Sequence, residues 1–408
     1  MSERVLITGT GVVSPNGLGA KEFWSATLEG RGGISPITRF DASGYRSALA
    51  GQILDFDPAE HLPNRLLPQT DVSTRLALVA ADWALSDGGV EPSELDVYDV
   101  GVITSNASGG FEFTHREFAN LWSKGPEFVS VYESFAWFYA VNTGQVSIRH
   151  KLRGPGAALV AEQAGGLDAL GHARRTVRLG TPVVVTGGVD SALDPWGWAS
   201  HLSSGLISAS ADPAEAYRPF AAAADGYVPG EGGAFLVMED ETAFLRRGAG
   251  RAYGELAGYA ATFDPPPGTD GPPALRRAAE LAIEDAGLEP SDIGVVFADA
   301  AGSPRLDAAE AEAISGIFGA RGVPVAAPKA MTGRLYAGGG PLDVVTALFS
   351  LRDGVVPAVG YPGGVPEEYG VDLVRGTPRP TDARAALVLA RGRWGFNSAV
   401  VVTSVRDE

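Results

Sequence analysis

The sequence contains no cysteine in its 408 residues. This absence excludes disulfide bonds, metal sites built from thiolates and covalent catalysis through a thiol. Histidine is also scarce, with five residues, and these show neither an i,i+4 pair nor a carboxylate motif typical of metal ligands. We therefore expect no metal site and no thiol chemistry on this chain.

Long apolar runs and excess basic charge are missing as well. No apolar stretch approaches the ~18 residues that a membrane span needs, and Met1 to Arg4 lead directly into a strand pattern without the features of a signal peptide. We accordingly expect a cytoplasmic protein. The net charge of −17 disfavours nucleic acid and anionic membranes as partners, and it disfavours this chain as the main docking site of an acidic carrier protein.

One segment, residues 157–170, has the layout of a nucleophile elbow. A short apolar run enters a turn of small residues, and a helix pattern then begins. Small neighbours at a helix N-terminus allow one side chain to stand clear for chemistry. The residue at the apex is Gln163, however, and a neutral amide is not a nucleophile.

An internal repeat predicts the architecture. A helix over 75–85 and another over 275–283 both end at a glycine followed by a proline, and each precedes an apolar strand. A second pair of helices begins near Gly166 and Gly340. Apolar strands between helices predict α/β halves, residues 1–250 and 251–408, whose sheets are buried on both faces.

Several motifs resemble those of the β-ketoacyl synthase family, which has a thiolase-type fold. The matching segments are spread over nearly the whole chain, at Val5 to Gly11, Pro229 to Gly233 and Gly395 to Ala399. The resemblance implies duplicated α/β halves in a layered αβαβα arrangement. Active members of the family use a cysteine to attack the acyl thioester and two histidines to assist decarboxylation of the extender.

All three of those catalytic groups are replaced here. By motif match, Gln163 stands in the cysteine position, and Ala301 and Arg334 stand in the two histidine positions. Arg334 cannot act as a base because its guanidinium stays protonated, and we expect it to pair with an acid that fills the pocket. Lys329 matches a family lysine, and without the histidines a structural role is the stronger interpretation.

The pattern is similar to that of one subfamily, the chain length factors, or ketosynthase β subunits, of type II aromatic polyketide synthases. The segments that carry this similarity are Glu162 to Gly166, Trp137 to Gln145 and Thr332 to Tyr336. It implies a chain that is active only as part of a heterodimer with a cysteine-bearing ketosynthase α subunit. It also implies an interface tunnel for the poly-β-ketone, no bound cofactor, and phosphopantetheine arriving on an acyl carrier protein mainly through the partner.

The same resemblance assigns a tunnel wall that limits chain length to four residues: Phe111, Thr114, Phe118 and Phe135. Large side chains at 111 and 118 favour a product closer to about eight ketide units than to longer chains, since close packing makes a steric limit sharp. A packed core or interface role for the aromatic residues of this stretch remains the alternative.

Gln163 has two interpretations. Its amide could support priming by hydrogen bonding to a thioester carbonyl or a carboxylate, or it could fill the space of the lost thiol and cap the helix. Two further functions therefore stay open: a malonyl decarboxylase that supplies acetyl starters through Gln163, and a purely structural partner of a ketosynthase.

Overall fold

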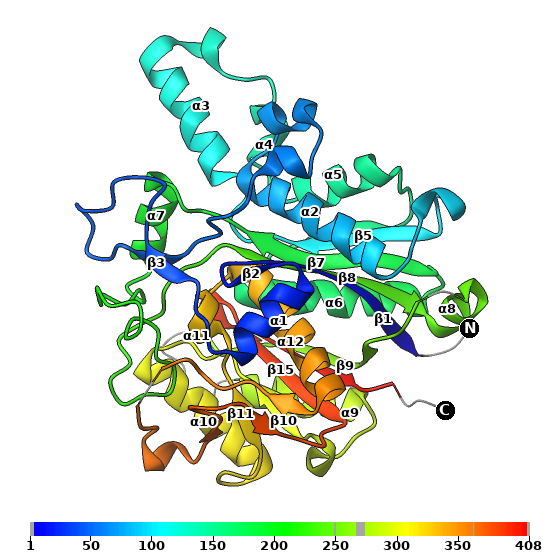
Figure 1. The fold of residues 1–408 in the computed structure, drawn as a ribbon, viewed down its shortest axis with the longest axis vertical. Coiled ribbons are helices and arrows are strands. Elements are labelled where there is room, and N and C mark those ends of the chain that lie inside the picture. Colours follow the sequence, from blue (N-terminus) through cyan, green and yellow to red (C-terminus); the bar gives the residue numbers. More distant parts are fainter. Residues whose placement is uncertain (1–3, 249, 267–273, 362, 406–408) are drawn as a thin grey trace.

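The computed structural model in Figure 1 describes residues 4–248, 250–266, 274–361 and 363–405. Its helices are α1 (Ala20–Leu28), α2 (Val72–Asp87), α3 (Phe111–Lys124), α4 (Glu133–Ala136), α5 (Val141–His150), α6 (Gln163–Arg178), α7 (Pro195–Leu202), α8 (Glu241–Arg247), α9 (Leu275–Asp285), α10 (Pro304–Phe318), α11 (Lys329–Thr332) and α12 (Gly339–Asp353). Short strands outside the central sheet path are β2 (Gly17–Leu18), β3 (Ile34–Pro36), β4 (Leu49–Gly51), β12 (Val355–Val356) and β14 (Arg379–Pro380).

The first half of the chain forms a sheet with the order β6-β5-β7-β8-β1. Its strands are β1 (Val5–Ser14), β5 (Val100–Ser105), β6 (Gly156–Leu159), β7 (Val183–Asp190) and β8 (Gly232–Asp240). Strands β6, β5 and β7 are parallel, whereas β8 is antiparallel to both β7 and β1.

The second half repeats this order as β11-β10-β15-β16-β9, with the same pattern of parallel and antiparallel neighbours. Its strands are β9 (Gly254–Phe263), β10 (Val295–Phe297), β11 (Pro324–Ala326), β15 (Ala385–Arg391) and β16 (Phe396–Thr403), and β13 (Asp372–Leu373) extends its outer edge. The two half-sheets meet where β1 and β9 pair at Leu6–Glu255 and Ile7–Gly254. The duplication that the sequence predicts is therefore confirmed strand by strand.

Two helices lie between the half-sheets and form the central layer. Helix α6 packs on β5 and β7 from one side and on β16 from the other, and α12 likewise contacts β8 and β15. Helices α2 and α9 cover the outer faces of the two half-sheets. The result is the predicted αβαβα arrangement, and it brings the start of α6, which carries Gln163, against the start of α12.

The sequence explains why these elements form. Strands β1, β5, β7 and β8 are buried along their whole length, as continuous apolar strands covered on both faces must be. The equivalent helices α2 and α9 end before Gly89 and Gly287, whose φ angles of 58° and 67° are the left-handed values that a C-terminal glycine adopts readily.

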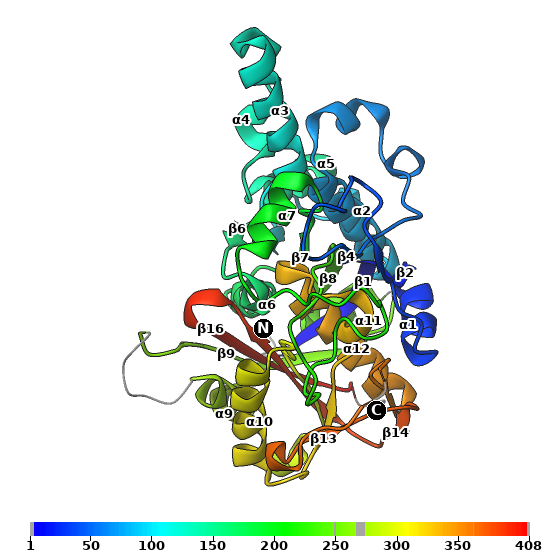
Figure 2. The same cartoon turned by 90° about the vertical axis from the view of Figure 1, so that its left-hand side faces the viewer.

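Helix α3 projects from the body of the molecule, as the two views in Figures 1 and 2 agree. Phe113, Thr114 and Glu117 are its buried residues. Few contacts therefore fix its position. Within the described residues, no helix is long and apolar enough to cross a bilayer.

Candidate functional site

The elbow lies between β6 and α6. Glu162 has φ 52° and ψ −130°, and α6 begins at the next residue, Gln163. Such a conformation costs a residue other than glycine about 1–3 kcal/mol and persists only where the surroundings enforce it. The backbone of a nucleophile elbow is thus retained although no nucleophile occupies it.

Gln163 at the apex is enclosed, with 1% of its surface exposed. Neither polar atom of its amide has a hydrogen-bond partner among the described residues. The prediction that Gln163 caps α6 is therefore wrong, because its side chain points away from the free amides of the first turn toward Gly339 of α12. The neighbouring cavity, lined also by Lys329 and Leu342, has a volume of about 10 Å³, which is room for roughly one water molecule.

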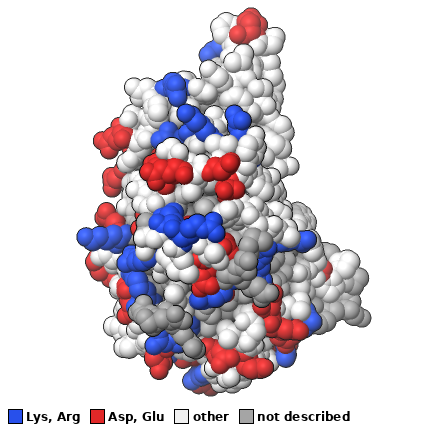
Figure 3. Space-filling model, turned by 90° about the vertical axis from the view of Figure 1, so that its right-hand side faces the viewer, with Lys and Arg blue, Asp and Glu red and all other residues white. Residues whose placement is uncertain are grey.

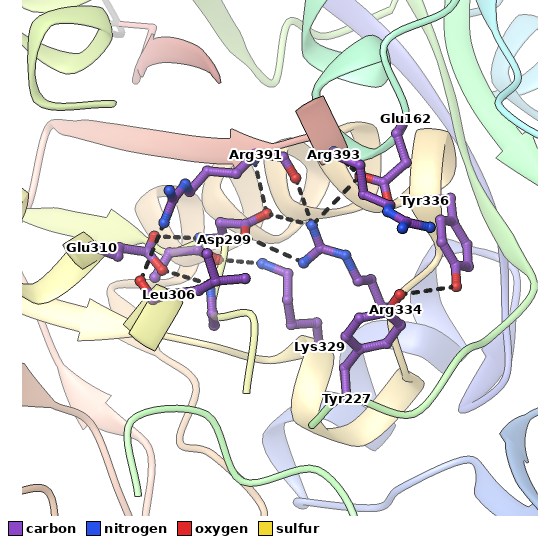
Figure 4. A network of polar contacts seen from close by, with 12 residues as sticks. Glu162, Tyr227, Asp299, Leu306, Glu310, Lys329, Arg334, Tyr336, Arg391 and Arg393 are labelled. Atoms are coloured by element: carbon purple, nitrogen blue, oxygen red, sulfur yellow. Dashed lines mark hydrogen bonds and ion pairs between the residues drawn. The ribbon is translucent and has the colours of Figure 1, made fainter. Parts of the chain in front are cut away.

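Arg334 fills the second histidine position. Its Nη2 lies 3.2 Å from Asp299 Oδ1 and 4.0 Å from Glu162 Oε2, and it donates to the carbonyl oxygen of Arg391 at 2.6 Å. The ring of Tyr227 lies beneath it, 5.4 Å from the guanidinium carbon (Figure 4). The expected pairing of Arg334 with an acid inside the pocket is confirmed.

The electrostatics make Arg334 a permanent cation. Burial alone acts to lower the pKa of Arg334, but the carboxylates of Asp299 and Glu162 outweigh burial and raise it well above its usual range. Burial raises the pKa of Glu162, and the charge of Arg334 and a hydrogen bond from the Arg393 amide at 2.8 Å oppose that rise. A guanidinium held in this way has no lone pair for acid–base work.

Ala301, in the first histidine position, offers only a methyl group and is buried. The adjoining amides of Asp299 and Ala300 donate to the Glu310 carboxyl at 2.7 and 2.8 Å. Burial, with the nearby charge of Asp299, raises the pKa of Glu310 to about 8. The polar groups here hold the backbone in place, and none of them faces the apex as a base.

Lys329 is also held in a structural contact. Its ammonium lies 2.7 Å from Asp343 of α12 and donates to the carbonyl oxygen of Ala298. Both charged side chains are 4% exposed. The three positions where the family carries its chemistry are thus occupied by an unpaired amide, a methyl group and a paired guanidinium.

A second cluster gathers aromatic side chains at the base of α3. The ring of Trp196, in the first turn of α7, lies 5.1 Å from the ring of Phe111 and 5.8 Å from that of Phe118. Phe118 in turn lies 5.4 Å from Trp122, which is 78% exposed. These rings form one continuous row from the body of the molecule to the projecting end of α3.

The four predicted wall residues do not all join that row. Phe111, Thr114 and Phe118 lie on α3, with Thr114 buried. Phe135 lies on α4, and its ring packs 6.0 Å from that of Tyr132. Trp196 was missed by the sequence analysis, although Asp194-Pro195 before it is a typical start of a helix after a buried strand.

The surface around this row is poorly covered. In the described part of the chain, β6 is an edge strand of the sheet. Large apolar side chains are exposed beside it and on residues 111–150, the arch from α3 to α5: Trp122, Val131, Trp137, Ile148 and Val160. On the face in Figure 3, acidic and basic side chains are interspersed over the body, and the projecting end is mostly uncharged. An open sheet edge beside exposed apolar residues is typical of an interface.

Comparison with known proteins identifies the class. The model of the β-ketoacyl synthase N-terminal domain matches residues 2–243, and that of the β-ketoacyl synthase C-terminal domain matches residues 253–360. The chain belongs to the β-ketoacyl synthase family, as its motifs predict.

Within that family the chain is similar to β-ketoacyl synthases of polyketide biosynthesis. The chain is 67% identical to the actinorhodin polyketide β-ketoacyl synthase 2 of Streptomyces coelicolor, over 98% of both chains. It is 55% identical to the tetracenomycin polyketide synthase ketoacyl synthase β subunit of Streptomyces glaucescens, again over 98% of both.

Solved structures have the same thiolase-type fold. The ishigamide ketosynthase/chain length factor aligns with a TM-score of 0.90 at 24% identity over 99% of both chains. A type II polyketide synthase ketosynthase, solved with its acyl carrier protein and bound to the hexaketide, aligns with a TM-score of 0.89 at 25% identity, over 98% of this chain and 99% of that one.

Proposed function

We propose that this chain is the non-condensing chain length factor of a type II aromatic polyketide synthase. In this proposal it pairs with a cysteine-bearing ketosynthase and forms part of the tunnel that limits poly-β-ketone length. The observation that carries the proposal is the enclosed catalytic position, where Arg334 is locked between Asp299 and Glu162 and Gln163 faces a cavity of about 10 Å³. No acyl thioester fits beside Gln163 in this arrangement.

The heterodimer interface in this proposal is the edge of β6 with the arch from α3 to α5. An unpaired edge strand is a template for another strand, and the exposed apolar groups beside it, with Trp122 78% and Val131 80% exposed, favour burial against a second protein. The partner would supply the thiol and the main docking site for the acyl carrier protein, whose phosphopantetheine carries the growing chain. This chain would need no cofactor of its own.

Length control in this proposal is steric. Each condensation adds two backbone carbons, and growth stops where the chain end meets the rings of Phe111, Phe118 and Trp196. Because protein interiors are close-packed, a ring at the end of a tunnel gives a sharp limit. We expect a product closer to about eight ketide units than to longer chains.

A second function is favoured by one observation, the unpaired amide of Gln163. Buried polar groups without partners are rare, and at this position the amide could hydrogen-bond a malonyl thioester during decarboxylative priming if the pocket opened. Gln163→Ala would then reduce starter incorporation at unchanged product length. Unchanged yield and starter incorporation would eliminate the priming role.

The main proposal is tested by co-expressing this chain with a cysteine-bearing ketosynthase and carrier protein and measuring product masses. Phe118→Ala and Phe118→Gly should both give longer products than the wild type. Phe244→Ala is the matched control, because Phe244 lies on α8, on the other side of the molecule from α3 (Figure 1). Unchanged length in both Phe118 variants, with normal co-purification, would leave only a structural partner role.

A further inference from the structure

The helices that carry the aromatic row, α3 and α7, are joined by a hydrogen bond. His115 of α3 places Nδ1 at 2.5 Å from Oδ2 of Asp194, the residue that precedes α7. Because an ionised carboxylate can only accept, His115 Nδ1 carries the hydrogen and donates it. The Asp194 side chain is 6% exposed and that of His115 is 39% exposed, so the contact lies at the margin between core and solvent.

The Asp194 carboxylate is itself rigidly attached to α7. Its Oδ1 accepts from the Gly197 amide at 2.9 Å, and its Oδ2 accepts from the Trp196 amide at 3.3 Å. This is the geometry of a helix N-cap. The same carboxylate therefore orients the first turn of α7, which carries the Trp196 ring, and holds a side chain of α3.

His115 lies at the centre of the aromatic face of α3. It stands four residues after Phe111 and three before Phe118, a spacing that places all three on neighbouring positions of one helix face. Its ring lies 6.3 Å from that of Trp196. A change in the distance between His115 and Asp194 would thus change the separation of Trp196 from both phenylalanine rings.

Other polar contacts hold the first half of α3: the Phe113 amide donates to Asp71 at 3.0 Å, and Glu117 accepts from the Ser130 amide at 2.7 Å. Beside the aromatic face of α3, a cavity of about 500 Å³ is lined by Arg75, Arg116, Ala119 and also by His115 and Asp194. Only three residues of α3, all in its first half, are buried. Because α3 has few buried residues and borders this cavity, its position depends on individual polar contacts.

We propose that the His115–Asp194 hydrogen bond fixes α3 against α7 and so sets where the Phe118 and Trp196 rings stand in the tunnel wall. His115 is then a positioning residue for chain length: it holds the rings that meet the polyketide. This inference rests on the function proposed above, because it concerns the same tunnel wall.

The test measures product length from the co-purified heterodimer with four variants of this chain. His115→Leu removes the donor at similar volume, and His115→Asn restores a donor at the place of Nδ1. Lys124→Leu, on the same helix but bonded to Asn120, is the matched control. Phe118→Ala is the positive control for the tunnel itself.

We expect the ratio of longer to normal-length product to rise about tenfold in His115→Leu, since a hydrogen bond to a charged group changes an equilibrium by about that factor. His115→Asn and Lys124→Leu should keep the wild-type ratio. The heterodimer yield is measured for each variant, so that the ratio is compared at equal assembly.

The other outcomes separate the two proposals. If Phe118→Ala lengthens the product but His115→Leu does not, the pair does not position the wall and the chain length function stands. An equal shift in His115→Leu and His115→Asn also overturns the inference, because the donor is then irrelevant. If neither Phe118→Ala nor His115→Leu alters the product, the proposed length control itself fails.

Discussion

Replacing Arg334 by alanine tests whether its guanidinium, paired with Asp299, stabilises the closed pocket at the former catalytic position. The change leaves the Asp299 side chain, 1% exposed, without its counterion and removes the donor to the Arg391 carbonyl. Removing one member of a buried ion pair typically costs about 3–5 kcal/mol. We therefore expect Arg334→Ala to lower the free energy of unfolding of the chain by about that amount.

Two further variants separate charge from packing. Arg334→Met keeps most of the volume but not the charge, so it should be nearly as destabilising as Arg334→Ala. Adding Asp299→Asn to Arg334→Met removes the uncompensated charge while one oxygen can still accept from the Arg391 amide, as Asp299 does at 2.9 Å. The double variant should recover about 2 kcal/mol or more.

The assay is urea denaturation followed by tryptophan fluorescence, with midpoint and slope both measured so that a changed slope is recognised. A loss below about 1 kcal/mol in Arg334→Ala would show that Asp299 does not depend on this cation. A double variant no more stable than Arg334→Met would show that packing, rather than charge, holds the pocket closed.

Three other predictions concern Gln163, Arg334 and Asp307, a buried residue of α10 whose carboxyl accepts from the Phe220 and Gly302 amides. In urea denaturation, Gln163→Leu should leave the free energy of unfolding unchanged or raise it by about 1 kcal/mol, because it replaces a buried amide that has no partner in the described residues. A fall in the free energy of unfolding of more than about 2 kcal/mol would contradict this prediction. Arg334→His in the heterodimer should not allow this chain to condense malonyl units, because Gln163 and Ala301 still replace the catalytic cysteine and the first histidine. Transfer of a labelled acyl group onto this chain would contradict this prediction. Burial raises the pKa of Asp307 to about 7, so the stability that its carboxyl contributes is full below about pH 4 and is lost as pH rises through 7. Asp307→Asn should therefore reduce the slope of unfolding free energy against pH by about 1 kcal/mol per pH unit between pH 4 and 7. The prediction fails if the wild type and the variant give parallel plots of unfolding free energy against pH.

Much of the fold could be predicted because it is recorded in local patterns. The paired helices before Gly89 and Gly287 and the apolar strands that follow them appear twice in the sequence, and the strand order repeats accordingly. The pairing of Arg334 was equally predictable, since a guanidinium in a buried pocket requires an acid.

The remaining features depend on contacts between distant segments. Whether Gln163 capped its helix depended on the strained backbone of Glu162 and on the close approach of α12, and neither is visible in the sequence. Trp196 lies far from Phe118 in sequence, and only the packing of α7 on α3 brings their rings to 5.8 Å. Phe135, the fourth predicted wall residue, lies on α4, whereas the other three lie on α3.

In the proposed function, side-chain volume on this chain limits the length of the product made by its partner's thiol. This limit is tested most directly by a volume series at one position, Phe118→Gly, Phe118→Ala, Phe118→Leu and Phe118→Trp, each co-expressed with the same ketosynthase and analysed by product mass. Product length should fall stepwise as the side chain grows, with Phe118→Trp at or below the wild-type length. The same length across the series, at normal heterodimer yield, would contradict it.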